Sequence, residues 1–316
     1  MRKASAVLLA IGVLVSAAAA DVWVAYEGGI NLYGDDGERI LEVPRYRNPA
    51  SLALDAERGR LWFVEQYDYS VVCIDTVSGK ELYRLEDIVH PRPTVAPDTY
   101  SSTEAETPPG LAIVGGNGNL WVADLYAHQV ALLDEDGTEL WRTSDFHEPY
   151  AVASAPDGSV WVVGGISDVF HLSPDGDVLH KRKKGLDEPR GVAVDAGREL
   201  VWITEYGNGR VIAVDYEGNL RRKVAVELPW SIVVDQDNGD VWVASTYDKV
   251  YLIASSGDVE LTVDRFETPA DVAVAPGLDV WVADRGDDRV TLLSADGERL
   301  LNIDGVRKPV SLAVER

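Results

Sequence analysis

Tryptophan recurs along this chain at a nearly constant spacing, and this spacing restricts the possible folds more than any other feature. The intervals between successive members of the set are 39, 59, 40, 41, 40 and 39 residues. The members are Trp23, Trp62, Trp121, Trp161, Trp202, Trp242 and Trp281. A period of this length is typical of repeat architectures in which each unit is one small supersecondary element. The single long interval indicates an insertion between the second and third units.

The unit that begins at Pro269 contains four short apolar segments separated by turns. The segments are 272–274, 280–283, 290–293 and 300–303. Asp296-Gly297 lies between the last two, and Asp and Gly accept the positive φ that tight hairpin turns require. The same turn recurs as Asp36-Gly37, Ser78-Gly79, Asp136-Gly137, Asp175-Gly176, Glu217-Gly218 and Ser256-Gly257. Four short antiparallel strands in about forty residues describe one blade of a β-propeller.

The two ends of the chain complement each other. Residues 22–25 have the pattern of a second strand without a first strand before it, and residues 310–314 have the pattern of a first strand with nothing after it. Pairing the two would complete one blade and close the ring without an open edge. We therefore predict an all-β fold, a seven-bladed β-propeller whose N- and C-terminal strands share one blade. The repeated tryptophans are expected to pack between blades.

Residues 1–20 have the pattern of a secretory signal peptide. Arg2 and Lys3 precede an apolar run at 4–15, and a small-residue segment ends at Ala20. The run is too short to span a bilayer comfortably, and no second apolar stretch of that length follows. We expect cleavage before Asp21, a single propeller domain at 21–316, and a secreted or periplasmic location. An N-terminal anchor that is not cleaved is the alternative.

The charge balance excludes one class of partner. The chain carries 29 basic and 53 acidic residues, for a net charge of −24. A protein with this charge repels phosphate backbones, so we expect no nucleic-acid partner. The charge is compatible with cation binding or a cationic ligand. Cys73 is the only cysteine, which rules out an intramolecular disulfide, and its apolar neighbours at 71–74 predict a core position.

Strand alternation predicts which loops share a face. If the first strand of each blade runs from top to bottom, the loops between second and third strands and the links between blades all lie on the top face. The insertion at about 86–107 joins blades two and three, so it is expected on top. It is rich in Pro, Ser, Thr and acidic residues. Long loops of this kind are either functional lids or disordered segments, and the sequence leaves both open.

Titratable residues on the predicted top face form a first candidate site. The residue three positions after each repeated tryptophan reaches this face, and two of these residues, Glu205 and Asp284, have an arginine five positions later that can pair with them. Glu65 and Asp124 have no such partner. Together with His90 they are candidate metal ligands for a divalent cation, calcium or magnesium. His128, His147 and Glu148 are candidate catalytic acid–base residues. Solvated side chains without a shared site are the alternative.

A second candidate site follows the proline that opens each blade. The residue after this proline is small or unremarkable in most blades, but it is Tyr150, Arg190 and Trp230 in blades four, five and six. Two aromatic side chains beside an arginine near the channel mouth would suit an anionic or aromatic ligand. The alternative is structural: Trp230 covers the core and Arg190 neutralises nearby acid.

The repeat resembles known propeller families. The pattern P-x-x-(V/L)-A-V-D, G-x-(V/L)-W-V-A-D, R-V and D-x-x-G resembles the NHL repeat over essentially the whole chain after residue 20. The stretches 149–161 and 202–212 are similar to repeats of the virginiamycin B (streptogramin) lyase family. That resemblance implies seven blades and a magnesium-dependent elimination that opens a cyclic lactone, with a histidine base on the top face. Gluconolactonase-like propellers, which bind calcium in the channel, are a more distant analogy.

These observations favour a binding protein over an enzyme. No complete catalytic set is evident, and blades six and seven contain no histidine. We expect an exported, monomeric NHL-type propeller that acts as a scaffold, with a protein, glycan or small-molecule ligand on its top face. The alternative is a metal-dependent lyase or lactonase. The fold alone does not decide between them.

Overall fold

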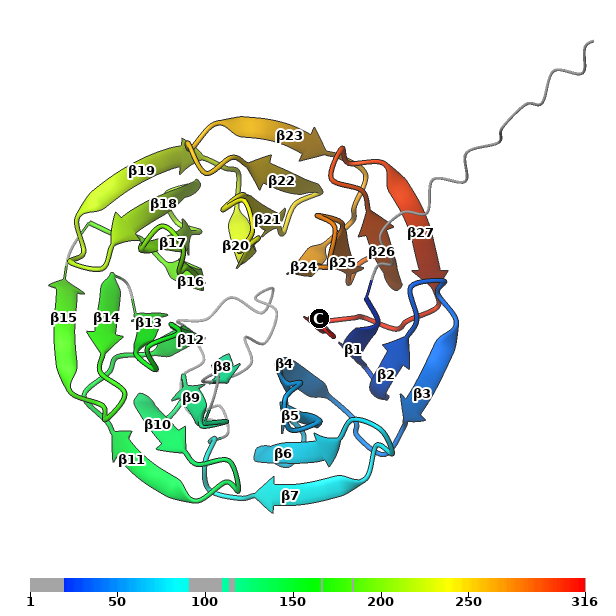
Figure 1. The fold of residues 1–316 in the computed structure, drawn as a ribbon, viewed down its shortest axis with the longest axis horizontal. Helices are drawn as coiled ribbons and strands as arrows, with labels where there is room; N and C mark the ends of the chain where they lie inside the picture. The colour runs from blue at the N-terminus through cyan, green and yellow to red at the C-terminus, as the bar shows by residue number, and fades with distance from the viewer. Residues whose placement is uncertain (1–19, 91–109, 114–116, 166, 184, 316) are drawn as a thin grey trace, which may run out of the picture.

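The computed structural model describes residues 20–90, 110–113, 117–165, 167–183 and 185–315. In these residues there are seven four-stranded antiparallel sheets arranged in a ring, and no helix (Figure 1). The predicted all-β, seven-bladed propeller is therefore confirmed. The predicted leader, apart from Ala20, and all of the predicted insertion beyond His90 lie outside the described residues. No helix in the described part of the chain has the length and apolarity needed to cross a membrane.

The strands fall into four concentric sets. The first strands, which surround the central axis, are β4 (Pro49–Asp55), β8 (Gly110–Ile113), β12 (Pro149–Ser154), β16 (Pro189–Asp195), β20 (Pro229–Val234), β24 (Pro269–Val274) and β28 (Ser311–Val314). The second strands are β1 (Val22–Tyr26), β5 (Arg60–Glu65), β9 (Leu120–Asp124), β13 (Val160–Gly164), β17 (Leu200–Glu205), β21 (Val241–Ser245) and β25 (Val280–Asp284).

The outer half of each blade has the same regularity. The third strands are β2 (Gly29–Tyr33), β6 (Ser70–Asp75), β10 (Gln129–Leu133), β14 (Asp168–Leu172), β18 (Arg210–Asp215), β22 (Lys249–Ile253) and β26 (Arg289–Leu293). The outermost strands are β3 (Arg39–Val43), β7 (Glu81–Leu85), β11 (Glu139–Thr143), β15 (Val178–Lys183), β19 (Leu220–Ala225), β23 (Val259–Val263) and β27 (Arg299–Asp304). The predicted glycine turns join third to outermost strands, and Gly297 has the expected positive φ of 79°.

The ring closes through the two ends of the chain, as predicted. The C-terminal strand β28 pairs antiparallel with β1, so blade 1 has the strand order β28-β1-β2-β3. The indole N–H of Trp23 donates to the carboxylate of Glu315 at 2.9 Å. These contacts join the first blade to the last residues of the chain and leave no unpaired first strand.

Seven apolar clusters hold neighbouring blades together, one at each junction. Each cluster contains one repeated tryptophan, and none of the seven is more than 2% exposed. Between blades 7 and 1, for example, Trp281 packs with Val22 and Leu312. The prediction that the tryptophans pack between blades is confirmed. Burial of aromatic and aliphatic surface between sheets is therefore the main source of stability in the ring.

A belt of hydrogen bonds links four first strands around part of the channel. On β24, the carboxylate of Asp271 accepts the Ser231 hydroxyl from β20 at 2.5 Å and the backbone N–H of Leu312 from β28 at 2.9 Å. The hydroxyl of Ser311 then accepts the N–H of Leu52 on β4 at 3.0 Å. These contacts cross three blade junctions, two of which flank the blade in which the ring closes. We call Ser231, Asp271, Ser311 and Leu52 the channel belt.

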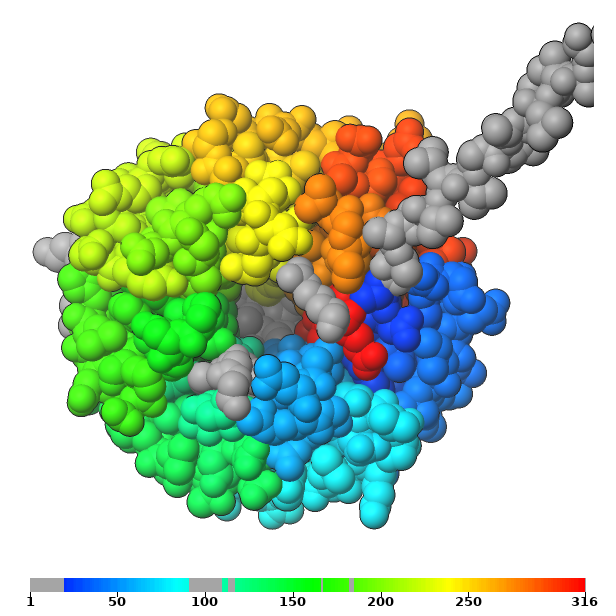
Figure 2. All heavy atoms as spheres, viewed as in Figure 1, coloured from blue at the N-terminus to red at the C-terminus, as the bar shows by residue number. Residues whose placement is uncertain are grey.

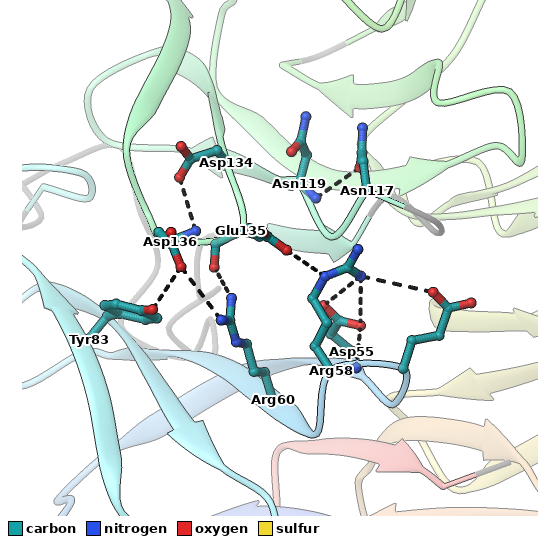
Figure 3. Close-up of polar contacts among 10 residues, drawn as sticks. Asp55, Arg58, Arg60, Tyr83, Asn117, Asn119, Asp134, Glu135 and Asp136 are labelled. Atoms are coloured by element: carbon teal, nitrogen blue, oxygen red, sulfur yellow. Dashed lines mark hydrogen bonds and ion pairs between the residues drawn. The ribbon is translucent and has the colours of Figure 1, made fainter.

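The junction between blades 2 and 3 has a polar contact of its own on the bottom face (Figure 3). Arg58 donates to Glu135 at 2.6 Å, and Tyr83 donates to Asp136 at 2.7 Å. Arg60 reaches both the Glu135 carbonyl and the Asp136 side chain. These are the two blades that the predicted insertion joins, so the side-chain network fastens their bottom faces independently of that connection.

The environment of Cys73 predicts a chemically inert thiol. Cys73 lies fully buried on β6, as expected from the sequence, and burial raises the pKa of its thiol to about 12. The thiolate is the reactive form, so native protein at pH 8 should not react with iodoacetamide, whereas protein in denaturant should react fully. Mass spectrometry before and after unfolding measures this. Rapid labelling of the native protein would contradict the core position.

The channel belt predicts a stability cost for loss of Asp271. In Asp271→Ala, the Ser231 hydroxyl and the Leu312 N–H lose their acceptor, so the free energy of unfolding should fall by about 2 kcal/mol. Urea denaturation followed by tryptophan fluorescence measures the change. Asp296→Ala, at an exposed hairpin turn, is the matched control and should change stability little. Equal effects of the two substitutions would contradict a role for the belt.

The same carboxyl predicts a pH dependence with a defined sign. Burial raises the pKa of Asp271 above 3.8, although its hydrogen bonds act in the opposite direction. The folded state therefore holds this proton more tightly than the unfolded state, and its contribution to stability is full below pH 3.8 and lost as pH rises through the folded-state pKa. Asp271→Asn, which does not ionise, should become more stable relative to wild type as pH rises across this range. A constant difference would contradict the raised pKa.

Candidate functional site

The seven first strands enclose a cavity of about 330 Å³ at the centre of the ring. The hollow is visible in the space-filling view of Figure 2. The described lining comes from all seven first strands, with up to three consecutive residues on each. Five of the seven first strands carry a β-bulge at this point; for example, the pairing register shifts between Pro149 and Ala151, between Pro189 and Val192, and between Pro229 and Ile232. A bulge adds a residue and turns its side chain, which explains why adjacent residues of one strand line the same cavity.

The lining forms three layers. The outermost layer contains the residue after the opening proline in five blades, namely Tyr150, Arg190, Trp230, Ala270 and Val310. The second layer is made mainly of small residues, which are Ser51, Gly110, Ala151, Gly191, Ser231 and Ser311, together with Asp271. The third layer is apolar and consists of Leu52, Leu111, Val152, Val192 and Ile232. Among the described lining residues only Arg190 and Asp271 carry a charge, so the cavity has one cationic and one acidic position.

Close packing explains two of the small residues in the second layer. A Cβ atom on Gly191 would lie 2.7 Å from the Trp230 carbonyl, and one on Gly110 would lie 2.9 Å from the Ala151 Cα. Both distances are shorter than real contacts allow. These glycines therefore let neighbouring first strands approach each other, and a larger side chain at either position would push blades apart.

Arg190 lies inside a cage of aromatic rings. Its guanidinium carbon is 4.3 Å from the ring centroid of Tyr150, 5.4 Å from that of Trp230 and 5.7 Å from that of Tyr206. Its side chain is 7% exposed and forms an ion pair with Glu188 at 3.2 Å. The structure thus brings the three sequence candidates together. With three rings this close to the guanidinium carbon, a ligand carboxylate would bind the guanidinium through its N–H groups.

Tyr206 is a cage residue that sequence reasoning missed. It follows Glu205 directly at the top of β17, and its ring meets that of Trp230 edge-on with centroids 5.9 Å apart. Its position one residue beyond the end of a second strand, on the predicted top face, is the signal that would have found it.

The carboxylates that end the second strands mainly anchor the links between blades. Glu65 accepts the backbone N–H groups of Arg47 and Asn48, which precede the proline of its own blade, at 2.9 and 3.0 Å. Asp284 accepts those of Glu267 and Thr268 in the same way. Backbone donors therefore supply the partner that Glu65 lacks in its own sequence neighbourhood, and both of its carboxylate oxygens accept hydrogen bonds.

Of the two salt bridges expected at these positions, one forms and the other does not. Glu205 pairs with Arg210, as predicted. Arg289 does not form a salt bridge with Asp284 and instead pairs with Asp304 at 2.6 Å and Asp287 at 3.5 Å. That prediction was wrong because backbone N–H groups already occupy the Asp284 carboxylate.

Asp124 and His90 form a pair above blade 3. The Asp124 carboxylate lies 2.6 Å from Nδ1 of His90 and also accepts the backbone N–H of Tyr126 at 3.1 Å. The amide of Gln129 lies 3.2 Å from the same ring nitrogen. Asp124 is 1% exposed, whereas the His90 side chain is 42% exposed. The pair can hold or transfer a proton at its exposed edge.

The remaining catalytic candidates gather between blades 3 and 4. The rings of His128 and His147 stack with centroids 5.3 Å apart. Nδ1 of His128 accepts the backbone N–H of Glu148 at 3.1 Å, so in the neutral ring the proton is on Nε2. Nδ1 of His147 lies 4.0 Å from the Glu148 carboxylate, and the His147 side chain is 65% exposed.

The predicted cation ligands do not fit a metal in the arrangement described. Both oxygens of Glu65 face N–H donors, and Asp124 faces Tyr126, Ala127 and His90. Within the described ranges no three His, Cys, Asp or Glu side chains are grouped closely enough to hold a metal ion. Calcium and magnesium need several oxygen ligands that are free of competing donors.

Comparisons with known proteins extend only to the fold. No family model matches the chain, and no curated protein matches it in sequence. Among solved structures, a catalytically inactive virginiamycin B lyase from Staphylococcus aureus with quinupristin aligns at a TM-score of 0.66 and 16% identity, covering 81% of this chain and 84% of that chain. Hydrazine synthase from Kuenenia stuttgartiensis aligns at a TM-score of 0.70 and 12% identity, covering 86% and 90%.

A third similar structure is a complex of nidogen and laminin. It aligns at a TM-score of 0.57 and 12% identity, covering 92% of this chain and 97% of that chain. At these identities the comparisons show a common fold and do not transfer an activity. Together with the strand order, they establish that the chain is a seven-bladed β-propeller whose structural neighbours include a lyase, a hydrazine synthase and a propeller seen in a protein complex.

Proposed function

We propose that this protein is an exported binding propeller that holds a small anionic or aromatic ligand at the top of its central cavity. The observation that carries the proposal is the cage in which Tyr150, Tyr206 and Trp230 surround Arg190. The cavity volume of about 330 Å³ is within the usual range for small-molecule sites, and its third layer is apolar. Apolar walls with one oriented cation favour a ligand that has a planar apolar body and a carboxylate.

The cage is suited to recognition because it orients the cation before a ligand arrives. Three rings fix the plane of the guanidinium, so little side-chain freedom remains to be lost on binding. Glu188 pairs with its N–H edge, and a ligand carboxylate would take the place of Glu188 there. The net charge of −24 does not attract anions over long distances, so affinity for an anion must come from this local geometry.

The first functional prediction concerns the two charges of the cage. In a thermal-shift screen with aromatic carboxylates, beginning with benzoate and indole-3-acetate, at least one compound should raise the melting temperature by mass action. For that compound Arg190→Gln should weaken binding roughly tenfold or more, since a charged hydrogen bond is lost. Glu188→Gln should strengthen binding because it removes the competing carboxylate.

Arg307→Gln is the matched control. Arg307 lies on the same face, is 63% exposed and pairs with Glu27, so its removal changes the net charge equally without touching the cage. Identical affinities of Arg190→Gln and Arg307→Gln would place the ligand elsewhere. If no aromatic carboxylate binds while a protein or glycan is retained on immobilised propeller, the small-ligand proposal fails and a macromolecular scaffold replaces it.

A second candidate function is acid–base catalysis by His147 and Glu148, in a lyase or lactonase. The stacked pair of His128 and His147, with Glu148 beside it, supports this candidate because it provides an exposed imidazole next to a carboxylate. The similar fold of virginiamycin B lyase with quinupristin suggests a cyclic lactone as the substrate class. His147 would remove a proton from the carbon next to the one that bears the ester oxygen, a C=C bond would form as the C–O bond breaks, and the acyl group would leave as a carboxylate. Glu148 would orient and stabilise the protonated His147 ring.

This candidate predicts turnover that depends on one side chain. Ring opening of quinupristin, followed by mass spectrometry, should be detectable in the presence of calcium or magnesium and should fall at least a hundredfold in His147→Ala, as expected for a general base. His180→Ala, at an exposed histidine on β15, is the matched control and should retain activity. Lack of turnover with either ion, or equal turnover in both variants, would exclude His147 as the base.

A further inference from the structure

The outermost strands of blades 4 and 5 differ in charge from every other outermost strand. β15 carries Lys181, Arg182 and Lys183, and β19 carries Arg221, Arg222 and Lys223, while neither strand contains an acidic residue. Each of the other five outermost strands contains at least one, namely Glu42, Glu81, Glu139, Glu260 and Asp304. Six cations are therefore concentrated on two strands of a protein with a net charge of −24.

The two strands are neighbours on the outer rim of the ring (Figure 1). His180 of β15 lies against Gly218, in the turn that leads into β19, so the two blades are in contact here. Arg222 packs against Gly257 of blade 6, whereas Lys223 lies opposite Ile212, which packs against blade 4. We call β15 and β19 together the basic rim.

Three of the six cations of the basic rim are exposed in the part of the structure that is described. They are Lys181, Arg221 and Lys223. Lys223 forms no ion pair with any residue that the structure describes, and Arg221 pairs with Asp215 at 2.5 Å while remaining 52% exposed. Desolvation raises the pKa of Asp215, but hydrogen bonds from Asn219 and Arg221 outweigh it and lower this pKa to about 2, so the carboxylate stays charged and offsets one cation. Other acidic residues occur in the adjoining bottom-face turns, at Asp175, Asp177 and Glu217.

Exposed aliphatic side chains lie on the same strands as the cations. Val178 is 57% exposed, Leu179 54% and Leu220 50%. Other outermost strands also expose an aliphatic residue, such as Ile40 or Leu300, but always on a strand that contains an acidic residue. Cations interleaved with exposed aliphatic groups match a lipid headgroup region, where phosphates meet the cations and apolar groups enter the interface. A hydrated acidic polymer would leave the aliphatic groups without a partner.

We propose that the basic rim is a docking surface for an anionic lipid bilayer. The proposal does not depend on the cavity ligand, since the rim lies on the outside of the ring. Binding would orient the propeller edge-on, with the ring axis along the bilayer plane and the cavity mouth clear of the lipid. The acidic remainder of the protein is repelled by the same surface, which favours this one orientation.

The test is sedimentation of the purified protein with vesicles. Protein should sediment at low salt with vesicles that contain phosphatidylglycerol, but not with pure phosphatidylcholine, and high salt should release it. The double variant Lys181→Gln/Lys223→Gln should bind roughly 25-fold more weakly, since each lost cation costs about fivefold. The control Lys80→Gln/Lys308→Gln changes net charge equally on other blades and should bind like wild type.

Two further measurements separate lipid from other partners. Leu179→Ser/Leu220→Ser should weaken vesicle binding but leave any binding to dextran sulfate unchanged. Failure of wild type to bind the anionic vesicles, or equal loss in the rim and control double variants, would overturn the proposal. Binding to dextran sulfate without binding to vesicles would identify an acidic polymer as the partner. Sedimentation of protein without vesicles would indicate self-association between the rim and the acidic surface.

Discussion

The structure depends on one repeated contact, the packing of a tryptophan from each second strand into the junction with a neighbouring blade. No single sheet of four short strands can bury both of its faces, so each blade is stable only between two neighbours. The seven tryptophans supply the largest fully or nearly fully buried side chains at these junctions. Closing the ring then removes the last two exposed faces, which explains why the C-terminal strand β28 completes the blade that β1 begins. Packing between blades and closure of the ring therefore both remove exposed sheet faces and edges.

The central cavity is a consequence of that packing. Seven blades whose first strands approach closely leave an axial space, and the residues at the second layer decide its width. Gly110 and Gly191 permit the closest approach on one side of the ring, whereas Ser231, Asp271 and Ser311 replace close packing by hydrogen bonds on the other. Bulges at the top of the first strands then turn Tyr150, Arg190 and Trp230 toward the mouth. These three residues therefore lie on strands, which keeps their geometry fixed before a ligand binds.

The apolar segments and glycine turns of the sequence were sufficient to predict the fold, because every strand and turn of a blade lies within one repeat of about forty residues. The strands expected at 272–274, 280–283, 290–293 and 300–303 all lie within β24 to β27. The candidate site was predicted less completely, since its contacts cross blades. The grouping of Tyr150 with Arg190 and Trp230 followed from their equivalent repeat positions, but Tyr206 is offset from that position and was missed. The partners of Glu65 and Asp284 are backbone N–H groups, which a search for opposite charges in the sequence does not detect.

The charged residues differ between the inner and outer strands of this propeller, and this difference bears on both proposed binding sites, the cage and the basic rim. The carboxylates of Glu65, Glu205 and Asp284 accept backbone hydrogen bonds and are buried. Most of the negative field that a partner meets therefore comes from turns and outer strands. In this negative field, an anionic partner can bind at two kinds of place. One is a cation enclosed by aromatic rings, as at Arg190, and the other is a group of several cations, as on β15 and β19. The two proposed sites differ in the range of their electrostatic attraction. The cage acts at contact distance on a small planar group, whereas the basic rim acts over roughly a Debye length on an extended surface. Only binding to the rim should therefore depend strongly on salt.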